Sequence, residues 1–366
     1  MTNLIGARIK ALREERRLSQ DDLARLFGFK DRQTVSAIET GERRVSAEEL
    51  ILAVEKLGQP LEFFTDPFRL VREGQFSWRQ DNVGEKILEA YENVAGRWIA
   101  AYREFRSKTE GQSWLFRRTL ALTRHHSFED AMAAGDQFAQ EFDLGDVPAS
   151  RLGEIMESRL SILVLHVEAF KGISGAAFRL PELDAVLINR KEVAGRRHFD
   201  LAHELFHILT WKEMPPQHAE EATETSKNRV EQLANSFASA VLMPTRVLNR
   251  YGDWSTVSDA ALPARLACVA EELQVTASAL KWRLVATERL KRAQALSISD
   301  SVLRNRRRDR NSPPPPLFSK AFMAVIGKAL AEGELSARCA AGLLDTTVDD
   351  LSDLLKSYGL ESPIDL

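Results

Sequence analysis

The chain has 366 residues, a formal net charge of −3 at pH 7, 44 % hydrophobic residues and two cysteines. This length exceeds the size at which a single hydrophobic core stops growing, so we expect two or three domains. The weak negative charge excludes a general attraction to nucleic acid and leaves any DNA binding to a local surface.

Neither a run of 18 apolar residues nor a basic-then-apolar leader occurs in the sequence. We therefore expect no membrane partner. Cys268 and Cys339 are too few and too far apart for a disulfide scaffold, which favours a reducing, cytoplasmic location.

The first 66 residues predict a compact set of short helices. Helix caps and terminal glycines predict helices over about 4–16, 19–28 and 32–39 and a fourth from 46 onward. The capping residues are Ser19 and Ser46, and the glycines that end helices are Gly28 and Gly41. Two short helices joined by a tight glycine-containing turn are typical of a helix-turn-helix unit.

The runs Leu-Ser-Gln-Asp-Asp-Leu-Ala at 18–24 and Thr-Val-Ser-Ala-Ile-Glu-Thr-Gly-Glu-Arg at 34–43 resemble the XRE (Cro/repressor-like) DNA-binding family. The resemblance implies that the third helix enters the major groove of a double-stranded DNA operator, usually as a homodimer on two half-sites. The residues that would face bases are Arg32, Gln33, Thr34 and Ser36; those that would contact phosphate or brace the reader are Gln20, Arg43 and Arg44. The alternative is a dimerisation or peptide-binding module. It stays open because residues 1–66 contain 11 basic and 12 acidic residues, so the segment has no net positive charge that would attract DNA.

Residues 67–148 predict a helical connector with amphipathic helices around 84–105, 114–124 and 127–142. Its aromatic residues, among them Trp78, Trp98 and Trp114, are expected to pack rather than to bind a ligand. His125 and His126 are adjacent and would point to different faces of a helix, so we expect no metal site there.

A small sheet is predicted next. The β-branched runs 161–167 and 184–189, with 175–178 between them, indicate three strands. An edge strand beside a metal cleft would hold an extended peptide through backbone hydrogen bonds.

The segment Ala202-His203-Glu204-Leu205-Phe206-His207 has H-E-x-x-H spacing, which puts two imidazoles one turn apart on one helix face. Two such nitrogens form half of a zinc site, and Glu204 could act as a base beside the metal. The alternative is a chance motif with ordinary half-buried histidines; the apolar neighbours favour a buried helix.

A third ligand is expected downstream. Residues 229–242 follow a helical period, with Glu231, Asn235 and Ser239 on one polar line, which makes Glu231 the best candidate. The competitors are His218 and the glutamates of a polar stretch that predicts a loop: Glu220, Glu221 and Glu224.

The order of strands, H-E-x-x-H helix, spacer and Glu231 helix, followed by Val-Leu-Met-Pro at 241–244, resembles the ImmA/IrrE metallopeptidase family over about residues 150–290. The resemblance implies a zincin-like domain with Zn²⁺ on His203, His207 and Glu231 and with Glu204 as general base. Phe206 stands where the family usually has glycine. This departure could change helix packing but touches no ligand.

The tail predicts two parts. A basic run at 303–310 and the prolines at 313–316 indicate an exposed hinge, or alternatively an arm that contacts phosphate. Beyond them, 336–344 resembles another helix-turn-helix start, but 347–358 is acidic and leucine-rich, so we favour a packing or oligomerisation role.

The sequence therefore predicts an α+β protein of five parts. In chain order they are an XRE-like helix-turn-helix domain (1–66), a helical connector (67–148), a zinc peptidase domain (149–295), a basic and proline-rich linker (296–317) and a C-terminal helical unit (318–366). The main hypothesis is a DNA-binding regulator whose zinc endopeptidase cleaves a partner repressor or antitoxin-like protein in a stress or phage response. His198, His218 or Tyr251 would stabilise the oxyanion.

Two alternatives keep the fold and change the function. In one, the metal domain of a transcription regulator senses a ligand or binds a partner and cleaves little or nothing. In the other, the protein is the antitoxin of a toxin–antitoxin pair.

Overall fold

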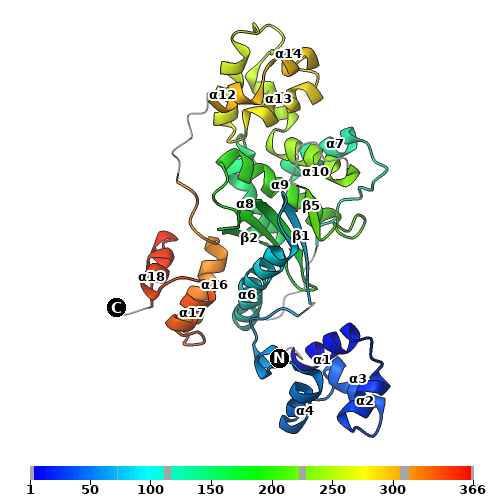
Figure 1. Ribbon diagram of the computed structural model, residues 1–366. Helices are drawn as coiled ribbons and strands as arrows, with labels where there is room; N and C mark the ends of the chain where they lie inside the picture. Colours follow the sequence, from blue (N-terminus) through cyan, green and yellow to red (C-terminus); the bar gives the residue numbers. More distant parts are fainter. Residues whose placement is uncertain (1–3, 72, 111–116, 222–227, 306–312, 364–366) are drawn as a thin grey trace. The chain divides into compact units, whose positions relative to one another are not determined.

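The computed structural model describes residues 4–71, 73–110, 117–221, 228–305 and 313–363 (Figure 1). The chain divides into two compact units, one of residues 1–74 and 89–111 and one of residues 75–88 and 112–366. The first unit is helical and the second combines helices with one sheet, which confirms the predicted α+β class. No helix in the described ranges is long and apolar enough to cross a membrane.

The first unit contains the predicted short helices. They are α1 (Leu4–Glu15), α2 (Gln20–Phe27), α3 (Arg32–Thr40), α4 (Ala47–Leu57) and α5 (Leu61–Thr65). Ser19 and Ser46 each form a capping box with the carboxylate three residues later. Gly28 and Gly41 end α2 and α3 at φ of 72° and 83°, a left-handed conformation that glycine adopts without strain.

One buried arginine fixes the end of this helical set. Arg8 of α1 is fully buried and donates hydrogen bonds to the carbonyl oxygens of Phe63 (2.8 Å), Asp66 (2.6 Å) and Arg69 (2.5 Å). The bonds hold the segment after α5 against α1, because a buried guanidinium is costly unless acceptors surround it. The long helix α6 (Glu85–Glu110) gives its residues from 89 onward to this unit.

The second unit is built on a five-stranded sheet of order β2-β4-β3-β1-β5 (Figure 1). The strands are β1 (Gln75–Gln80), β2 (Ile162–Val167), β3 (Ile173–Arg179), β4 (Asp184–Asn189) and β5 (Ala219–Glu221). β3 pairs antiparallel with β1 and β4, while β2 pairs parallel with β4 and β5 parallel with β1.

The structure confirms the three predicted strands and corrects the segments around them. The connector was predicted to be helical, but residues 75–80 form β1, which lies between β3 and β5 in the sheet. The helix predicted over 114–124 is wrong for 117–124, which has no regular structure; residues 114–116 lie outside the described ranges. The loop predicted around Glu220 and Glu221 instead begins with β5.

Helices cover one face of this sheet. α9 (Ala194–Thr210) packs on β3 and β4, and α10 (Arg229–Leu242) packs between α9 and α7 (Phe128–Glu141). The α7 and α10 backbones approach closely at Gly135, where a Cβ atom would lie 2.6 Å from the carbonyl oxygen of Phe237. α8 (Pro148–Leu160) packs on β2. These layers place α9 and α10 side by side over the sheet.

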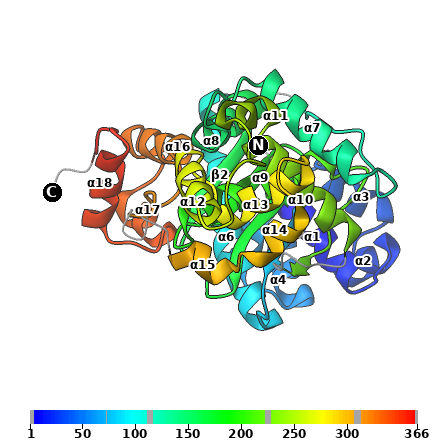
Figure 2. The same cartoon turned by 90° about the horizontal axis from the view of Figure 1, so that it is seen from above.

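Smaller helices complete the second unit, and the view of Figure 2 shows α12 to α14 grouped near α9 and α10. They are α11 (Thr245–Leu248), the 3₁₀ helix Asn249–Tyr251, α12 (Leu262–Glu272), α13 (Ala277–Ala286), α14 (Arg292–Ser297) and α15 (Asp300–Asn305). Leu303 of α15 is 4 % exposed, so the segment predicted as an exposed linker is packed at least to that point. Residues 306–312 of the basic run lie outside the described ranges.

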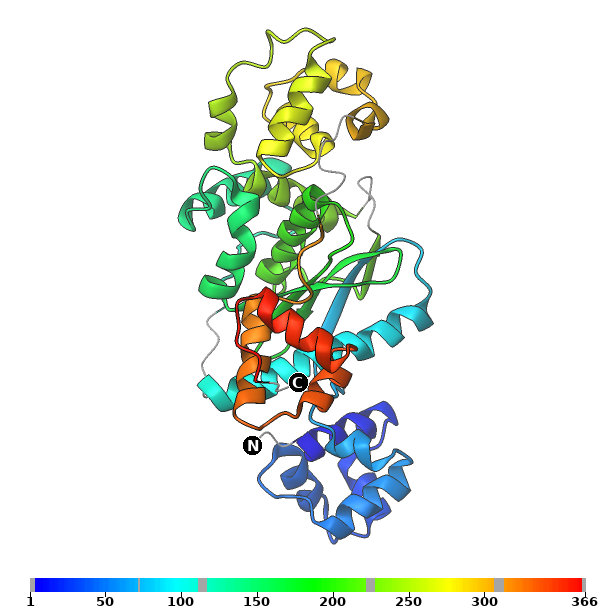
Figure 3. The same ribbon diagram turned by 90° about the vertical axis from the view of Figure 1, so that its left-hand side faces the viewer.

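The C-terminal residues form three helices, α16 (Lys320–Ala331), α17 (Ala337–Leu343) and α18 (Val348–Ser357), which Figure 3 shows as one orange-to-red cluster. Phe318 precedes them and pairs with His166 of β2 through two backbone hydrogen bonds of 3.2 and 2.6 Å. Ser319 also donates a 2.6 Å hydrogen bond to Glu157 of α8. The helical prediction for this end of the chain is therefore confirmed.

Candidate functional site

The ligands predicted on the H-E-x-x-H segment lie in the middle of α9. Their neighbours on this helix are apolar, which explains why the helix is buried on most sides. His203, Glu204 and His207 are each exposed by 2 % or less. Phe206 is fully buried and contacts Phe237 of α10 with ring centroids 5.5 Å apart. The residue that replaces the usual glycine thus serves to join α9 to α10.

Three potential ligand atoms converge between these two helices. Nε2 of His203 lies 3.1 Å from Nε2 of His207, and the two nitrogens lie 3.2 and 3.1 Å from the carboxylate oxygens of Glu231. Ligands about 2.0–2.1 Å from a tetrahedral ion are roughly 3.3 Å from one another. The spacing therefore suits a metal ion such as Zn²⁺, and within the described ranges no other group of three metal-ligating side chains is found.

The electrostatics of the cluster also suit a cation. Nδ1 of His203 lies 2.9 Å from Oδ1 of Asn235, which can only accept, so the proton is on Nδ1 and the Nε2 lone pair faces Glu231. Burial, followed by the positive charge of Arg79, lowers the pKa of His203 to about 4, which keeps its imidazole neutral. Burial raises the pKa of Glu231, whereas positive charge and N–H donors on the two imidazoles lower it far below its usual value; with neutral imidazoles, a bound cation would have the same lowering effect.

Asn235 is a neighbour of the candidate ligands whose contact the sequence interpretation did not assign. It lies one turn after Glu231 on α10, on the polar line that the sequence indicated. A hydrogen-bond acceptor behind a ligating histidine fixes its tautomer and ring orientation.

Glu204 lies beside the cluster but is not part of it. A Cβ atom on Gly175 of β3 would lie only 3.7 Å from Cγ of Glu204, so a glycine here leaves room for the acidic side chain between α9 and the sheet. Burial raises the pKa of Glu204 to about 8. A bound cation beside this carboxyl group would lower its pKa again.

The short strand β5 forms the edge of the sheet next to β1. The edge of β1 is paired with β5, and the backbone N–H of Trp78 also donates a 2.9 Å hydrogen bond to the carbonyl oxygen of His218. The segment between the two ligand helices therefore supplies the edge strand on this side of the sheet.

The other side chains predicted for the site do not belong to the group of three candidate ligands in the part of the chain that the structure describes. His198 contacts the carbonyl oxygen of Gln274 through Nδ1 (2.8 Å), and Tyr251 pairs with Glu272, so both are directed toward α12. Glu224 lies outside the described ranges, as do the side chains of Glu220 and Glu221. His125 and His126 belong to no metal-ligating group within the described ranges.

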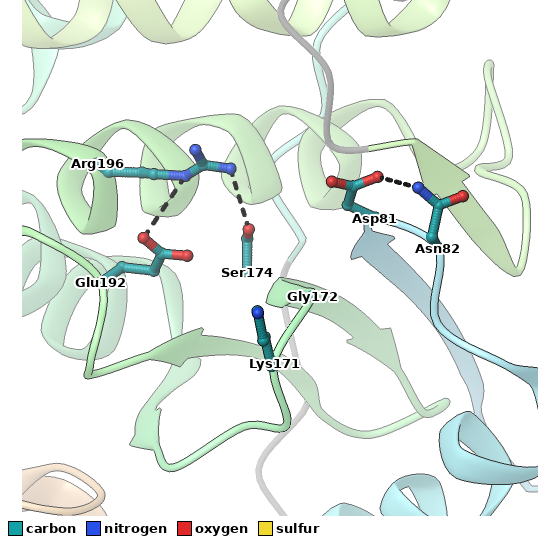
Figure 4. Close-up of a pocket in the computed structure, with 7 residues that line it drawn as sticks. All are labelled: Asp81, Asn82, Lys171, Gly172, Ser174, Glu192 and Arg196. Carbon is teal, nitrogen blue, oxygen red and sulfur yellow. Dashed lines mark hydrogen bonds and ion pairs between the residues drawn. The ribbon is translucent and has the colours of Figure 1, made fainter.

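A polar pocket of about 440 Å³ opens at the N-terminal end of α9 (Figure 4). Two charged residues mark its wall on the α9 side: Arg196 binds Oγ of Ser174 (3.3 Å) and pairs with Glu192 (3.8 Å). The remaining lining residues come from the β1–α6 and β2–β3 turns and are Asp81, Asn82, Lys171 and Gly172. Arg196 also lies 3.8 Å from Asp200, which connects the pocket wall to the buried part of α9.

The predicted DNA-contacting residues lie on or next to α2 and α3. Arg32 and Gln33 are exposed at the start of α3, and Thr34 and Ser36 are half-buried on the same helix. Gln20 donates a 2.9 Å hydrogen bond to Glu39, which also pairs with Arg13 at 2.7 Å.

The two predicted arginines of the turn after α3 are also exposed. Arg43 pairs with Glu49 of α4 at 2.8 Å, and Arg44 is exposed. Gln20 thus joins α2 to α3, Arg13 joins α1 to α3, and Arg43 joins the turn after α3 to α4.

Comparison with known proteins gives two family matches. A helix-turn-helix family model matches residues 9–64, and a model of the IrrE N-terminal-like domain, a peptidase family, matches residues 159–285. No curated protein and no solved structure matches the chain. The first match covers α1 to α5, and the second covers all but β1 of the sheet together with the ligand helices α9 and α10. The chain therefore combines an XRE-type helix-turn-helix domain, typical of DNA-binding regulators, with an IrrE-like domain of the metallopeptidase type.

Proposed function

We propose that this protein is a DNA-binding transcriptional regulator with a zinc-dependent endopeptidase domain, and that it cleaves a partner repressor or antitoxin-like protein in a stress or phage response. The observation that carries the proposal is the convergence of His203, His207 and Glu231 at ligand spacing, with Glu204 next to them and outside the ligand set. A purely structural zinc site needs no free carboxylate beside it.

Each residue has a separate task in this proposal. His203, His207 and Glu231 would hold Zn²⁺, with Asn235 fixing the orientation of His203. When bound, the ion supplies a Lewis acid that polarises a peptide carbonyl and activates water. Glu204 would accept a proton from the attacking water and deliver it to the leaving amine. Burial raises the pKa of Glu204 and a bound cation would lower it; these opposing effects suit a carboxyl group that first accepts a proton and then releases it.

The helix-turn-helix domain would bind a double-stranded DNA operator as a homodimer, since paired reader helices fit two half-sites. Arg32, Gln33, Thr34 and Ser36 would face bases. Gln20, Arg43 and Arg44 would contact phosphate or brace α3. Cleavage of a partner regulator and operator binding in one chain would link proteolysis to gene control.

The test combines metal analysis with a base variant in the full-length protein. Wild type should bind one equivalent of zinc and cleave a co-encoded candidate regulator, whereas Glu204→Gln should keep the zinc and lose cleavage. Glu231→Ala should lose about one equivalent of zinc. Cleavage that survives Glu204→Gln would refute the assigned base, and full zinc occupancy in Glu231→Ala would reject this ligand.

Burial of the site favours a second candidate function. Every ligand side chain and Glu204 is exposed by 2 % or less, so a peptide has little access to the cluster in this conformation. A regulator or antitoxin whose metal domain binds a partner or senses a ligand without proteolysis would need no such access. It would retain zinc but show no cleavage in wild type, under conditions where DNA binding is intact.

A further inference from the structure

Arg79 of β1 is a buried arginine next to the proposed catalytic carboxylate. It is 5 % exposed. In the β1–β3 register it lies opposite Gly175, and directly opposite residues of an antiparallel pair project to the same face of the sheet. That face is the one on which Gly175 approaches Glu204 of α9. The Arg79 side chain therefore extends beneath α9 toward the candidate metal site.

One ion pair holds Arg79 in place. Its Nε lies 3.2 Å from Oδ1 of Asp200, which is 1 % exposed and sits one helical turn before Glu204 on α9. Residues four apart on a helix share a face, so Asp200 places the guanidinium on the side of α9 that carries Glu204. Asp200 is also the residue that links Arg196 of the pocket wall to this interior.

The guanidinium of Arg79 keeps a hydrogen-bond donor that the described residues do not satisfy. Among the residues that the structure describes, the buried Nη1 of Arg79 has no hydrogen-bond partner, and Nε meets Asp200 as an ion pair without hydrogen-bond geometry. A buried donor without an acceptor is unfavourable, and such a group in a native fold calls for an explanation. A ligand with an oxygen acceptor would satisfy it.

The charge of Arg79 acts on the metal site as well. Its positive charge is, after burial, the largest contribution to the lowered pKa of His203. A fixed cation this close opposes the binding of Zn²⁺, so its presence is a disadvantage for metal affinity alone. The same charge is an advantage for a substrate whose carbonyl oxygen gains negative charge during attack.

We propose that Arg79 is a catalytic residue that donates a hydrogen bond from Nη1 to the carbonyl oxygen of the scissile peptide bond. The inference rests on the proposed peptidase function and deepens it, because it adds an oxyanion partner to the three side chains that the sequence suggested, His198, His218 and Tyr251. Asp200 is the positioning residue that holds the guanidinium by its opposite edge.

The test uses the full-length protein loaded with Zn²⁺ and two probes. Acetohydroxamate is small and binds the metal itself; a phosphonamidate tripeptide carries tetrahedral anionic oxygens where the scissile carbonyl would be. Binding of both is measured by calorimetry for wild type, Arg79→Met, Arg79→Lys and the control Arg179→Met. Arg179 lies on β3 and pairs with buried Asp184 at 2.8 Å, so it reports the general effect of removing an ion-paired strand arginine.

We expect Arg79→Met to weaken phosphonamidate binding by about 10- to 100-fold, as for the loss of a hydrogen bond to a charged group. Acetohydroxamate binding and zinc content should change by less than about twofold. Arg79→Lys should fall between, because an ammonium group lacks the planar fork of arginine. The control should keep wild-type affinity for both probes.

The outcomes separate the inference from the proposed function. Phosphonamidate affinity within twofold of wild type in Arg79→Met would overturn the inference, as would wild-type protein that binds acetohydroxamate but no phosphonamidate. Wild-type protein that binds no zinc would overturn the proposed function itself. If Arg79→Met does not fold, the double variant Arg79→Met/Asp200→Asn removes both charges of the buried pair, and the same comparison is made with it.

Discussion

Asn235→Ala offers a direct test of how the protein prepares a histidine for metal binding. In the folded protein Oδ1 of Asn235 accepts a hydrogen bond from Nδ1 of His203, which keeps the lone pair of Nε2 on the side of the cluster. Alanine removes the acceptor but retains the helix, because alanine has the highest helix propensity. Without the acceptor, the imidazole can carry its proton on Nε2, and a metal ion then has to displace it.

The magnitude follows from the role of the bond. Loss of the partner behind a ligating histidine costs about 10- to 100-fold in metal affinity, or about 1.4–2.7 kcal/mol. The buried Nδ1–H also loses its acceptor, which destabilises the folded apoprotein by about 1–3 kcal/mol. We therefore expect a lower zinc affinity together with a lower melting temperature, and the affinity loss should persist well below the melting temperature of the variant.

The assay is a zinc competition titration against a chromophoric chelator at a temperature where wild type and variant are both folded by circular dichroism. Ser239→Ala is the matched control: Ser239 lies one turn further along the same polar line, and its hydroxyl bonds to the carbonyl oxygen of Ser236 rather than to a ligand. Asn235→Asp keeps an acceptor and should retain zinc affinity. Unchanged zinc affinity in folded Asn235→Ala would refute the argument that this bond selects the tautomer.

Three further predictions concern packing, pH and DNA. Gly135→Ala should lower the free energy of unfolding by about 1–3 kcal/mol, because its Cβ would lie 2.6 Å from a carbonyl oxygen of α10. The control Gly153→Ala, whose Cβ has nothing nearer than 3.8 Å, should be neutral or stabilising. The melting temperatures of the two variants are compared, and equal shifts would contradict overpacking at Gly135. Burial lowers the pKa of His166 to about 4, so its contribution to stability is present above about pH 6.5 and is lost as the pH falls toward 4. Between those pH values the free energy of unfolding of wild type, measured in urea, should fall by up to about 3 kcal/mol relative to that of His166→Gln. Parallel pH profiles of the two proteins would exclude this cause. Gln33→Ala should reduce discrimination between DNA sequences, while Arg43→Ala should weaken binding to every sequence and lower the salt dependence of binding. Fluorescence anisotropy over a salt series distinguishes these two patterns. If wild type shows no salt-dependent DNA binding, the domain is a protein-interaction module instead.

The candidate metal site could be predicted because its information is local. His203 and His207 are one turn apart on one helix, and Glu231 stands on a second helix whose apolar period marks its buried face. The caps at Ser19 and Ser46 are local signals as well, and the structure contains both. The sequence also placed Asn235 on the polar line of α10, but it did not predict that the side chain would bind Nδ1 of His203.

The parts that could not be predicted depend on distant partners. β1 has the sequence Gln-Phe-Ser-Trp-Arg-Gln, and its buried residues are stabilised by β3, almost a hundred residues later. Arginine is rarely buried without a partner, so Arg79 in the sequence argues against a buried strand. Its partner, Asp200, lies on α9 and becomes known only from the structure. β5 is three residues long and contains two glutamates, so its composition resembles a loop and only its pairing with β1 defines it.

The pairing of β1 and Phe318 with the sheet has a practical consequence for work on isolated fragments. A fragment made from the family match alone, residues 159–285, would lack both segments. β3 would lose its partner on one side, and β2, with the sequence Ile-Leu-Val-Leu-His-Val, would lose its bridge to Phe318. Uncharged, β-branched strands with unpaired backbone groups recruit other chains, so such a fragment should self-associate as its concentration rises. A stable fragment of the metal domain should therefore begin no later than residue 75 and extend at least to residue 319, which also brings in residues 89–111 of the other unit.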